Sequence, residues 1–201
     1  MLLTDVGGVV ARPRRQFAAI AGGAGRPVLT AGLVVAVSGA ALGLLGVVAN
    51  ALEPANRRAG TGVAGTVLSA LTPLFLLVFW MVGASLLDAA AGLMSADRRR
   101  RAFLVASAYA MPVLAGYGAV RVLQALLDRG GVDATVSDGV GLLDLLLLLW
   151  FIALLATAAR VVYDLSPLNA VAAALLPFAA ITGVLAVLLT VASLLHAGGL
   201  I

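Results

Sequence analysis

The sequence predicts an all-α, polytopic integral membrane protein with five transmembrane helices. Of its 201 residues, 63% are hydrophobic and only 11% are charged, whereas a soluble domain is about 45–50% apolar and about 25% charged. A soluble fold of this size could not solvate so apolar a surface. The chain also contains several charge-poor stretches of the roughly 20 residues that a helix needs to cross a bilayer. Both observations indicate a membrane-embedded bundle.

The five predicted spans follow from the charge-poor stretches and from prolines and helix-capping residues near their ends or within them. Pro73, Pro112 and Pro177 interrupt the second, third and fifth spans. Ser166 is a natural N-cap and Pro167 a natural first helical residue, which together place the start of the last span. The spans are expected at residues 27–49, 66–94, 103–127, 139–162 and 168–196, and form one transmembrane domain over residues 27–201.

Small residues on the first span suggest a close helix contact. Gly39 and Gly43 form a G-x-x-x-G pattern, which lets a neighbouring helix approach closely. Chance produces many such matches in so alanine-rich a chain, so the pattern alone is a weak signal.

Residues 1–26 are expected to form a cytoplasmic N-terminal segment. It does not resemble a signal peptide, because no basic region precedes its apolar start. Phe17 and Ile20 are three residues apart on one helical face with arginines around them, a pattern typical of a helix lying on the membrane surface. A frayed terminus fits equally well, and both interpretations stay open.

The placement of arginine predicts the orientation. All 13 basic residues are arginines, and eight of them lie in the N-terminal segment and in the loop after the second span. The loop after the third span is net acidic. By the positive-inside rule, the N-terminus is cytoplasmic and the C-terminus, after five spans, is external. Arg57 and Arg58 violate the rule. Arginine without lysine, with abundant Ala, Leu, Gly and Val, suggests a GC-rich prokaryotic genome and hence a prokaryotic cell membrane.

Catalytic, cofactor and metal sites are not expected. The single histidine is His196, and the chain lacks cysteine and lysine, so common hydrolase and nucleotide motifs are excluded. Gly60 to Gly65 match a dinucleotide fingerprint, but that motif needs a strand before it and a helix after it. Asp133 and Asp138 lie in a loop, where solvation is a better interpretation than a metal. Because the arginines flank the spans, no nucleic-acid partner is expected.

Four ionisable residues are expected inside the spans: Asp88, Arg121, Asp144 and Arg160. Each costs about 2.5–3.5 kcal/mol on insertion scales, so such groups tend to be paired or functional. Arg121 and Asp144 should lie at equal depth in the antiparallel third and fourth spans, and we expect them to pair. Asp88 and Arg160 would pair at the inner face if spans two and four are neighbours. Alternatively, each arginine reaches the interface unaided.

A run of four arginines marks the loop after the second span. Arg98, Arg99, Arg100 and Arg101 are expected to contact anionic lipid headgroups, since each arginine near such a surface contributes about 1 kcal/mol. The alternative is that these residues only determine topology. The lipid bilayer is therefore a predicted partner, with a membrane protein or a second copy of the chain as a further partner.

The order of these features resembles the Yip (Ypt-interacting protein) domain family, as its prokaryotic members appear. The resemblance lies in the Pro-Arg-Arg-x-Phe-x-x-Ile segment of Pro13–Ile20, the Tyr-Ala-x-Pro pattern of Tyr109–Pro112 and the Leu-Leu-Pro-Phe of Leu175–Phe178. Ser95-Ala96-Asp97 departs from the Gly-Gly that members often carry. The eukaryotic Asp-Leu-Tyr-Gly-Pro motif is also absent, so eukaryotic Rab binding is not carried over.

The resemblance implies a non-enzymatic, five-span membrane protein. Eukaryotic members act in vesicle trafficking, and bind small GTPases or shape membranes. We therefore expect a membrane-organising or interaction protein, or an accessory subunit of a membrane complex. The alternatives are a transporter or channel component, favoured by prolines in three spans, and a membrane enzyme, which the absence of a recognisable site disfavours.

Overall fold

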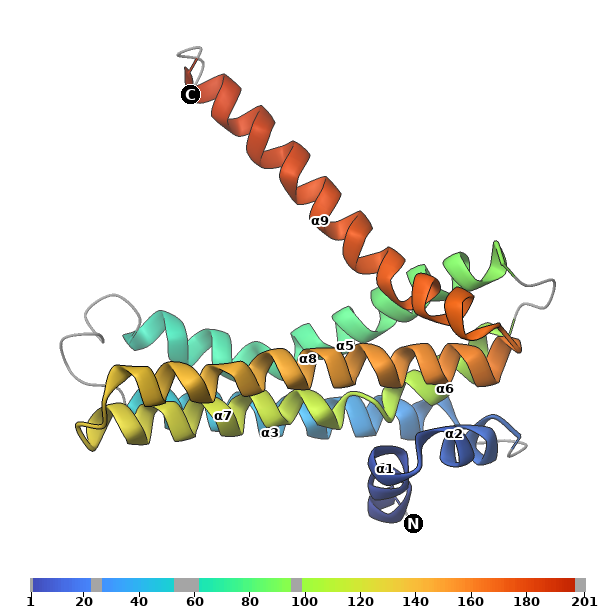
Figure 1. The fold of residues 1–201 in the computed structure, drawn as a ribbon, viewed down its shortest axis with the longest axis horizontal. Coiled ribbons are helices and arrows are strands. Elements are labelled where there is room, and N and C mark those ends of the chain that lie inside the picture. Colours follow the sequence, from blue (N-terminus) through green and yellow to red (C-terminus); the bar gives the residue numbers. More distant parts are fainter. Residues whose placement is uncertain (1, 23–26, 53–61, 95–98, 198–201) are drawn as a thin grey trace.

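The computed structural model describes residues 2–22, 27–52, 62–94 and 99–197, and these residues are almost entirely α-helical (Figure 1). Two short helices precede a bundle of long ones. The helices are α1 (Leu2–Ala11), α2 (Pro13–Gly22), α3 (Val28–Leu52), α5 (Gly62–Gly92), α6 (Arg100–Ala108), α7 (Pro112–Arg129), α8 (Ala134–Tyr163) and α9 (Pro167–Ala197). The described part of the Gly60–Gly65 pattern, from Gly62 on, lies in the first turn of α5, while Gly60 and Thr61 lie outside the described residues.

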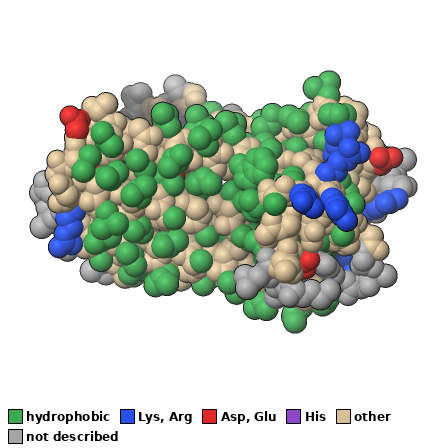
Figure 2. Space-filling view, turned by 60° about the horizontal axis from the view of Figure 1, so that its bottom comes forward, with side chains coloured by type: hydrophobic (Ala, Val, Ile, Leu, Met, Phe, Trp, Pro, Cys, Tyr) green, Lys and Arg blue, Asp and Glu red, His purple; other side chains and the backbone are tan. Residues whose placement is uncertain are grey.

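Four helical segments of the described chain are long and apolar enough to cross a membrane. They are Val28–Leu52, Ala64–Gly92, Arg100–Arg129 and Thr135–Tyr163. Apolar side chains cover the middle of the bundle in the space-filling view, while basic side chains gather toward its ends (Figure 2). The all-α fold is thereby confirmed, and four of the predicted spans coincide with long apolar helices that could cross a membrane.

The fifth predicted span falls on α9. The first part of α9 packs against α5 and α8, and the helix then leaves the bundle at an angle (Figure 1). Ala170, Ala173 and Ala174 are buried in the packed part, and Pro177 follows them. The Pro167–Ala179 part of α9 is apolar, but by itself it is shorter than the roughly 20 residues that a bilayer requires. The fifth span therefore stays a prediction.

Pro112 divides the third span into α6 and α7. Proline lacks the N–H that a continuous helix would use, and its ring clashes with the preceding turn. The backbone tightens instead, with Tyr109 N–H donating to Ala106 O at 3.1 Å and Met111 N–H donating to Ala108 O at 3.2 Å. Every residue from Val105 to Met111 is buried. This break is the centre of the bundle, since α6 contacts α2, α3, α5 and α8.

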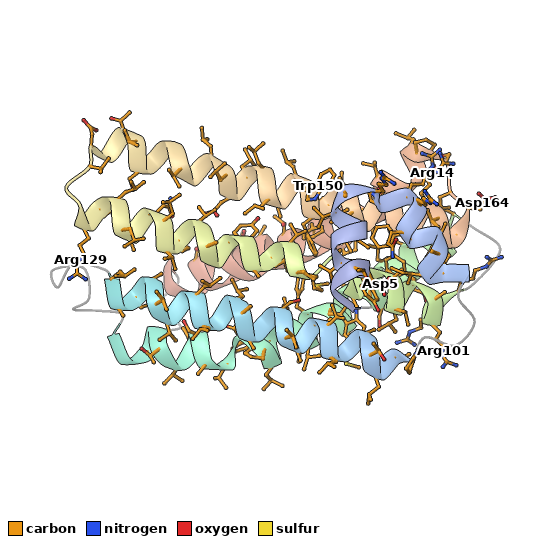
Figure 3. The ribbon with its side chains drawn as sticks, turned by 90° about the horizontal axis from the view of Figure 1, so that it is seen from below. Asp5, Arg14, Arg101, Arg129, Trp150 and Asp164 are labelled. Carbon is orange, nitrogen blue, oxygen red and sulfur yellow. The ribbon has the colours of Figure 1, made fainter. Side chains whose placement is uncertain are left out.

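The two ends of the bundle differ in composition. Arg14, Arg101 and Asp164 lie at one end, and Arg129 lies at the other (Figure 3). We call the first the arginine-rich end. The N-terminal segment and the loop after the second span thus meet at the same end, as their charge predicted. Which side of the membrane this end faces stays a prediction.

The acidic loop at the opposite end caps a helix. Asp133 precedes α8 and accepts a hydrogen bond from the Thr135 N–H at 2.8 Å. This bond holds the pKa of the exposed Asp133 carboxyl below its ordinary value. At the other terminus of α8, Asp164 adopts a left-handed conformation with φ 51°. Ser166 Oγ then accepts from the Asn169 N–H at 3.3 Å, which confirms the predicted start of α9.

The apolar face of the N-terminal segment is directed at the protein. Phe17 and Ile20 on α2 are buried, and α2 packs against α6 and α8. Both α1 and α2 run across the bundle axis near the arginine-rich end (Figure 3). Residues 2–22 are therefore helical and α2 is docked on the bundle. An interfacial location of this segment stays a prediction.

Glycines allow α3 and α5 to cross closely. A Cβ atom at Gly39 would lie 2.6 Å from Pro73 Cα, and one at Gly43 would lie 2.3 Å from the backbone oxygen of Ser69. Real side chains do not tolerate such distances. The G-x-x-x-G pattern of the first span therefore forms a helix interface, as its spacing indicated.

Substituting Gly43 by Ala is expected to lower the free energy of unfolding in detergent by about 1–3 kcal/mol, because the added Cβ forces α3 away from the α5 backbone. Gly32→Ala is the matched control on α3, since a Cβ there meets nothing within 4 Å. Thermal unfolding followed by intrinsic fluorescence measures both. Equal effects of the two substitutions would show that the close crossing is not responsible.

Candidate functional site in the centre of the bundle

A buried tryptophan ties α5 to the helix break. Trp80 Nε1 on α5 donates to the Leu104 backbone oxygen at 3.2 Å and to Ser107 Oγ at 3.1 Å. Trp80 is 3% exposed and Ser107 is 1% exposed. A buried indole N–H needs such a partner. The bonds fix α5 against the last turn of α6, directly before the break.

A second polar contact lies about two turns further along α5. The hydroxyl of Tyr163, at the end of α8, donates to Oδ1 of Asp88. The Tyr163 ring packs against Phe103 of α6, with ring centroids 5.6 Å apart and planes inclined at 42°. One tyrosine therefore joins three helices near the arginine-rich end.

An apolar cavity separates the two polar contacts. Its volume is about 30 Å³, and its walls come from α5, α6, the break, α8 and α9. Representative lining residues are Phe79, Gly83, Phe103, Met111, Phe151 and Pro177. A ligand pocket for a drug-sized molecule usually measures about 300–1,000 Å³. The cavity beside the break is thus much smaller than such a pocket.

The predicted inner residues are positioned as follows. Asp88 is bonded to Tyr163, while Arg160 lies one turn before Tyr163 on α8 and is half-buried. The Asp88–Arg160 ion pair stays a prediction. Sequence reasoning missed Tyr163. The available signal was its spacing of three residues from Arg160, which places both on one face of the helix.

The predicted outer residues have a different environment. Oδ1 of Asp144 is buried and has no hydrogen-bond partner among the described residues. Tyr117 on α7 lies within electrostatic range of Asp144, and Gln124 Nε2 donates to Ser137 O at 3.5 Å between the same two helices. Arg121 is exposed. The structure thus packs α7 against α8. Within the described chain, Asp144 Oδ1 remains without a hydrogen-bond partner, and the Arg121–Asp144 ion pair stays a prediction.

The described part of the arginine run lies at the start of α6. Arg99, Arg100 and Arg101 are exposed, and Arg98 lies outside the described residues. Arg100 also donates to Ser85 Oγ on α5 at 3.0 Å. This position suits headgroup contact, which stays a prediction.

The helical bundle and its internal polar contacts define a multi-pass membrane protein. The Yip1 domain family model matches residues 7–189, and the chain belongs to this family. Members of the family are generally non-enzymatic membrane trafficking proteins. Neither a curated protein nor a solved structure matches the chain. The matched range includes the N-terminal, Tyr109–Pro112 and Leu175–Phe178 segments that carried the resemblance.

Tyr163→Phe removes the hydroxyl that Asp88 accepts from but keeps the ring against Phe103. We expect a loss of about 0.5–2 kcal/mol in unfolding free energy, in the range of interhelical hydrogen bonds in membranes. Adding Asp88→Asn should produce little further loss, because contacting partners are not additive.

Tyr117→Phe is the control for a lost tyrosine hydroxyl, since that hydroxyl has no hydrogen-bond partner within the described chain. Fully additive losses for the Asp88 and Tyr163 substitutions, measured by thermal unfolding, would contradict the coupling between these two side chains.

Proposed function

We propose that this Yip1-domain protein is a non-catalytic, membrane-organising or interaction protein of a prokaryotic cell membrane. The observation that carries the proposal is how the buried and half-buried polar side chains are used. Trp80, Ser107, Asp88 and Tyr163 all bond between helices of the same bundle. They hold the fold together around a cavity of about 30 Å³, which is too small for an ordinary substrate.

We further propose that the partner is a membrane protein, either an unrelated one or a second copy, and that it contacts α9. This helix leaves the bundle after Pro177 (Figure 1). Leu175 and Leu176 are 44% and 42% exposed where it departs. An apolar helix that extends away from its own bundle has a side available for another transmembrane helix.

The proposed topology has five spans, a cytoplasmic N-terminus and an external C-terminus. Its support is the shared location of the arginines of α2 and α6 at one end of the bundle (Figure 3). A C-terminal reporter that is active only in the cytoplasm should be silent, and one active only outside should give signal. N-terminal fusions of the same two reporters should give the opposite pattern. A C-terminus that reports from the cytoplasm would show that α9 does not cross.

One observation favours a transporter or channel as a second candidate. An uncompensated carboxylate inside a membrane is costly, and such groups mark ion or proton pathways in many transporters. The buried, unpartnered Oδ1 of Asp144 has this character.

Two measurements separate these candidates. A photo-crosslinking amino acid at Leu176 should give a discrete adduct in native membranes, whereas the same group at Leu74, an exposed position on α5, should not. In proteoliposomes, the wild type and Asp144→Asn should both show background ion flux. Flux that Asp144→Asn abolishes would establish the transport candidate. Absence of the adduct would contradict a partner on α9.

A further inference from the structure

An open groove lies where α1 and α2 meet, away from the central polar contacts. Its volume is about 580 Å³. The lining residues are Gly7, Gly8, Ala11, Arg12, Arg15 and Gln16. Small residues of α1 form one wall, and basic and amide side chains from the turn and from α2 form the other.

The hairpin is held by a contact that depends on glycine. Gln16 Nε2 donates to Oδ1 of the buried Asp5 at 2.8 Å. A Cβ at Gly8 would lie 2.8 Å from the Gln16 carboxamide carbon, so glycine permits this approach. A Cβ at Gly7 would meet nothing within 4 Å, so space remains above the helix backbone there. The groove is thus a product of the hairpin geometry.

The charged residues that line the groove, Arg12 and Arg15, are both basic. Arg12 and Arg15 are exposed, and their guanidinium groups have no hydrogen-bond or ion-pair partner among residues 2–22 and the other described segments. Guanidinium groups bind phosphate oxygens in a bidentate geometry. Two arginines beside a backbone wall therefore suit a phosphate group.

The location of the groove favours a lipid headgroup as the source of the phosphate. The α1–α2 hairpin lies across the bundle axis at the arginine-rich end, the same end as Arg14 and Arg101 (Figure 3). Val10, next to the groove, is 45% exposed. A helix that lies across the spans with apolar and basic residues beside each other suits the boundary between acyl chains and headgroups.

We propose that this groove binds the phosphate of an anionic phospholipid headgroup, with Arg12 and Arg15 as the phosphate ligands. None of the described arginines Arg99, Arg100 and Arg101 lines this groove. It would hold one lipid at the N-terminal hairpin and thereby fix the height of α1 and α2 at the membrane surface.

The test uses the full-length protein in a neutral detergent with dioctanoyl phosphatidylglycerol as the probe. Titration by thermal shift should show saturable stabilisation of the wild type. Dioctanoyl phosphatidylcholine should give none, because its headgroup is neutral overall. The Arg12→Gln/Arg15→Gln variant should bind at least about tenfold more weakly, as loss of charged hydrogen bonds predicts. Its melting temperature without lipid shows whether it is folded.

Two further variants make the test specific. Arg14→Gln is the matched control, because Arg14 is exposed on the same helix but does not line the groove, and its affinity should equal that of the wild type. Gly7→Leu keeps every charge but fills the groove, and should also abolish binding.

Three results would overturn the proposal. Equal weakening by Arg14→Gln would indicate diffuse surface attraction, and unchanged binding by Gly7→Leu would exclude the groove. Stabilisation by inorganic phosphate alone, at the same concentrations as the lipid, would identify a soluble phosphate ligand in place of a lipid headgroup.

Discussion

The missing N–H of Pro112 is the constraint on which the arrangement of the bundle depends. Unsatisfied backbone groups cannot face lipid without a cost of several kcal/mol, so irregular backbone at membrane depth must be covered by protein. The span that contains the break is accordingly the central one. In the most apolar 18-residue stretch of this span, 61% of the residues are buried, against 17–33% in the corresponding stretches of the other three long apolar helices. Trp80 adds a side-chain donor to the carbonyl of Leu104 just before the break.

The polar residues around the break also satisfy hydrogen-bonding groups inside the bundle. Ser107 Oγ accepts a hydrogen bond from the Trp80 indole N–H. The Tyr163 hydroxyl donates to Asp88, while its ring packs against Phe103. Apolar packing between helices in lipid lacks a hydrophobic driving force, so close contacts and interhelical hydrogen bonds decide which helices associate. The glycine crossing of α3 and α5 supplies the close contact, and the two hydrogen-bonded pairs connect α5 to α6 and α8.

The physics of helices in lipid also explains which parts of the fold and of the candidate site could be predicted from the sequence. Apolar runs and helix caps determine where helices begin and end, so four spans and the Ser166–Pro167 start could be predicted. Gly39 and Gly43 could be suggested as an interface because small residues stand out. The partners of Asp88 and Trp80 could not, since they lie 75 and 27 residues away. In lipid the outer face of a helix is as apolar as its inner face, so periodicity does not reveal its rotation. The departure of α9 from the bundle likewise has no local signal beyond Pro177.

The N-terminal hairpin depends on the central break as well. Phe17 and Ile20 bury α2 against α6 and α8, and α6 is itself positioned by the turn before Pro112. The groove at Arg12 and Arg15 is therefore not on a free tail, because it sits on a helix whose opposite face is part of the core. A ligand held in the groove would act on α2, and through Phe17 on the segment that contains the break. The groove and the packing at the bundle centre are joined by one short helix, α2.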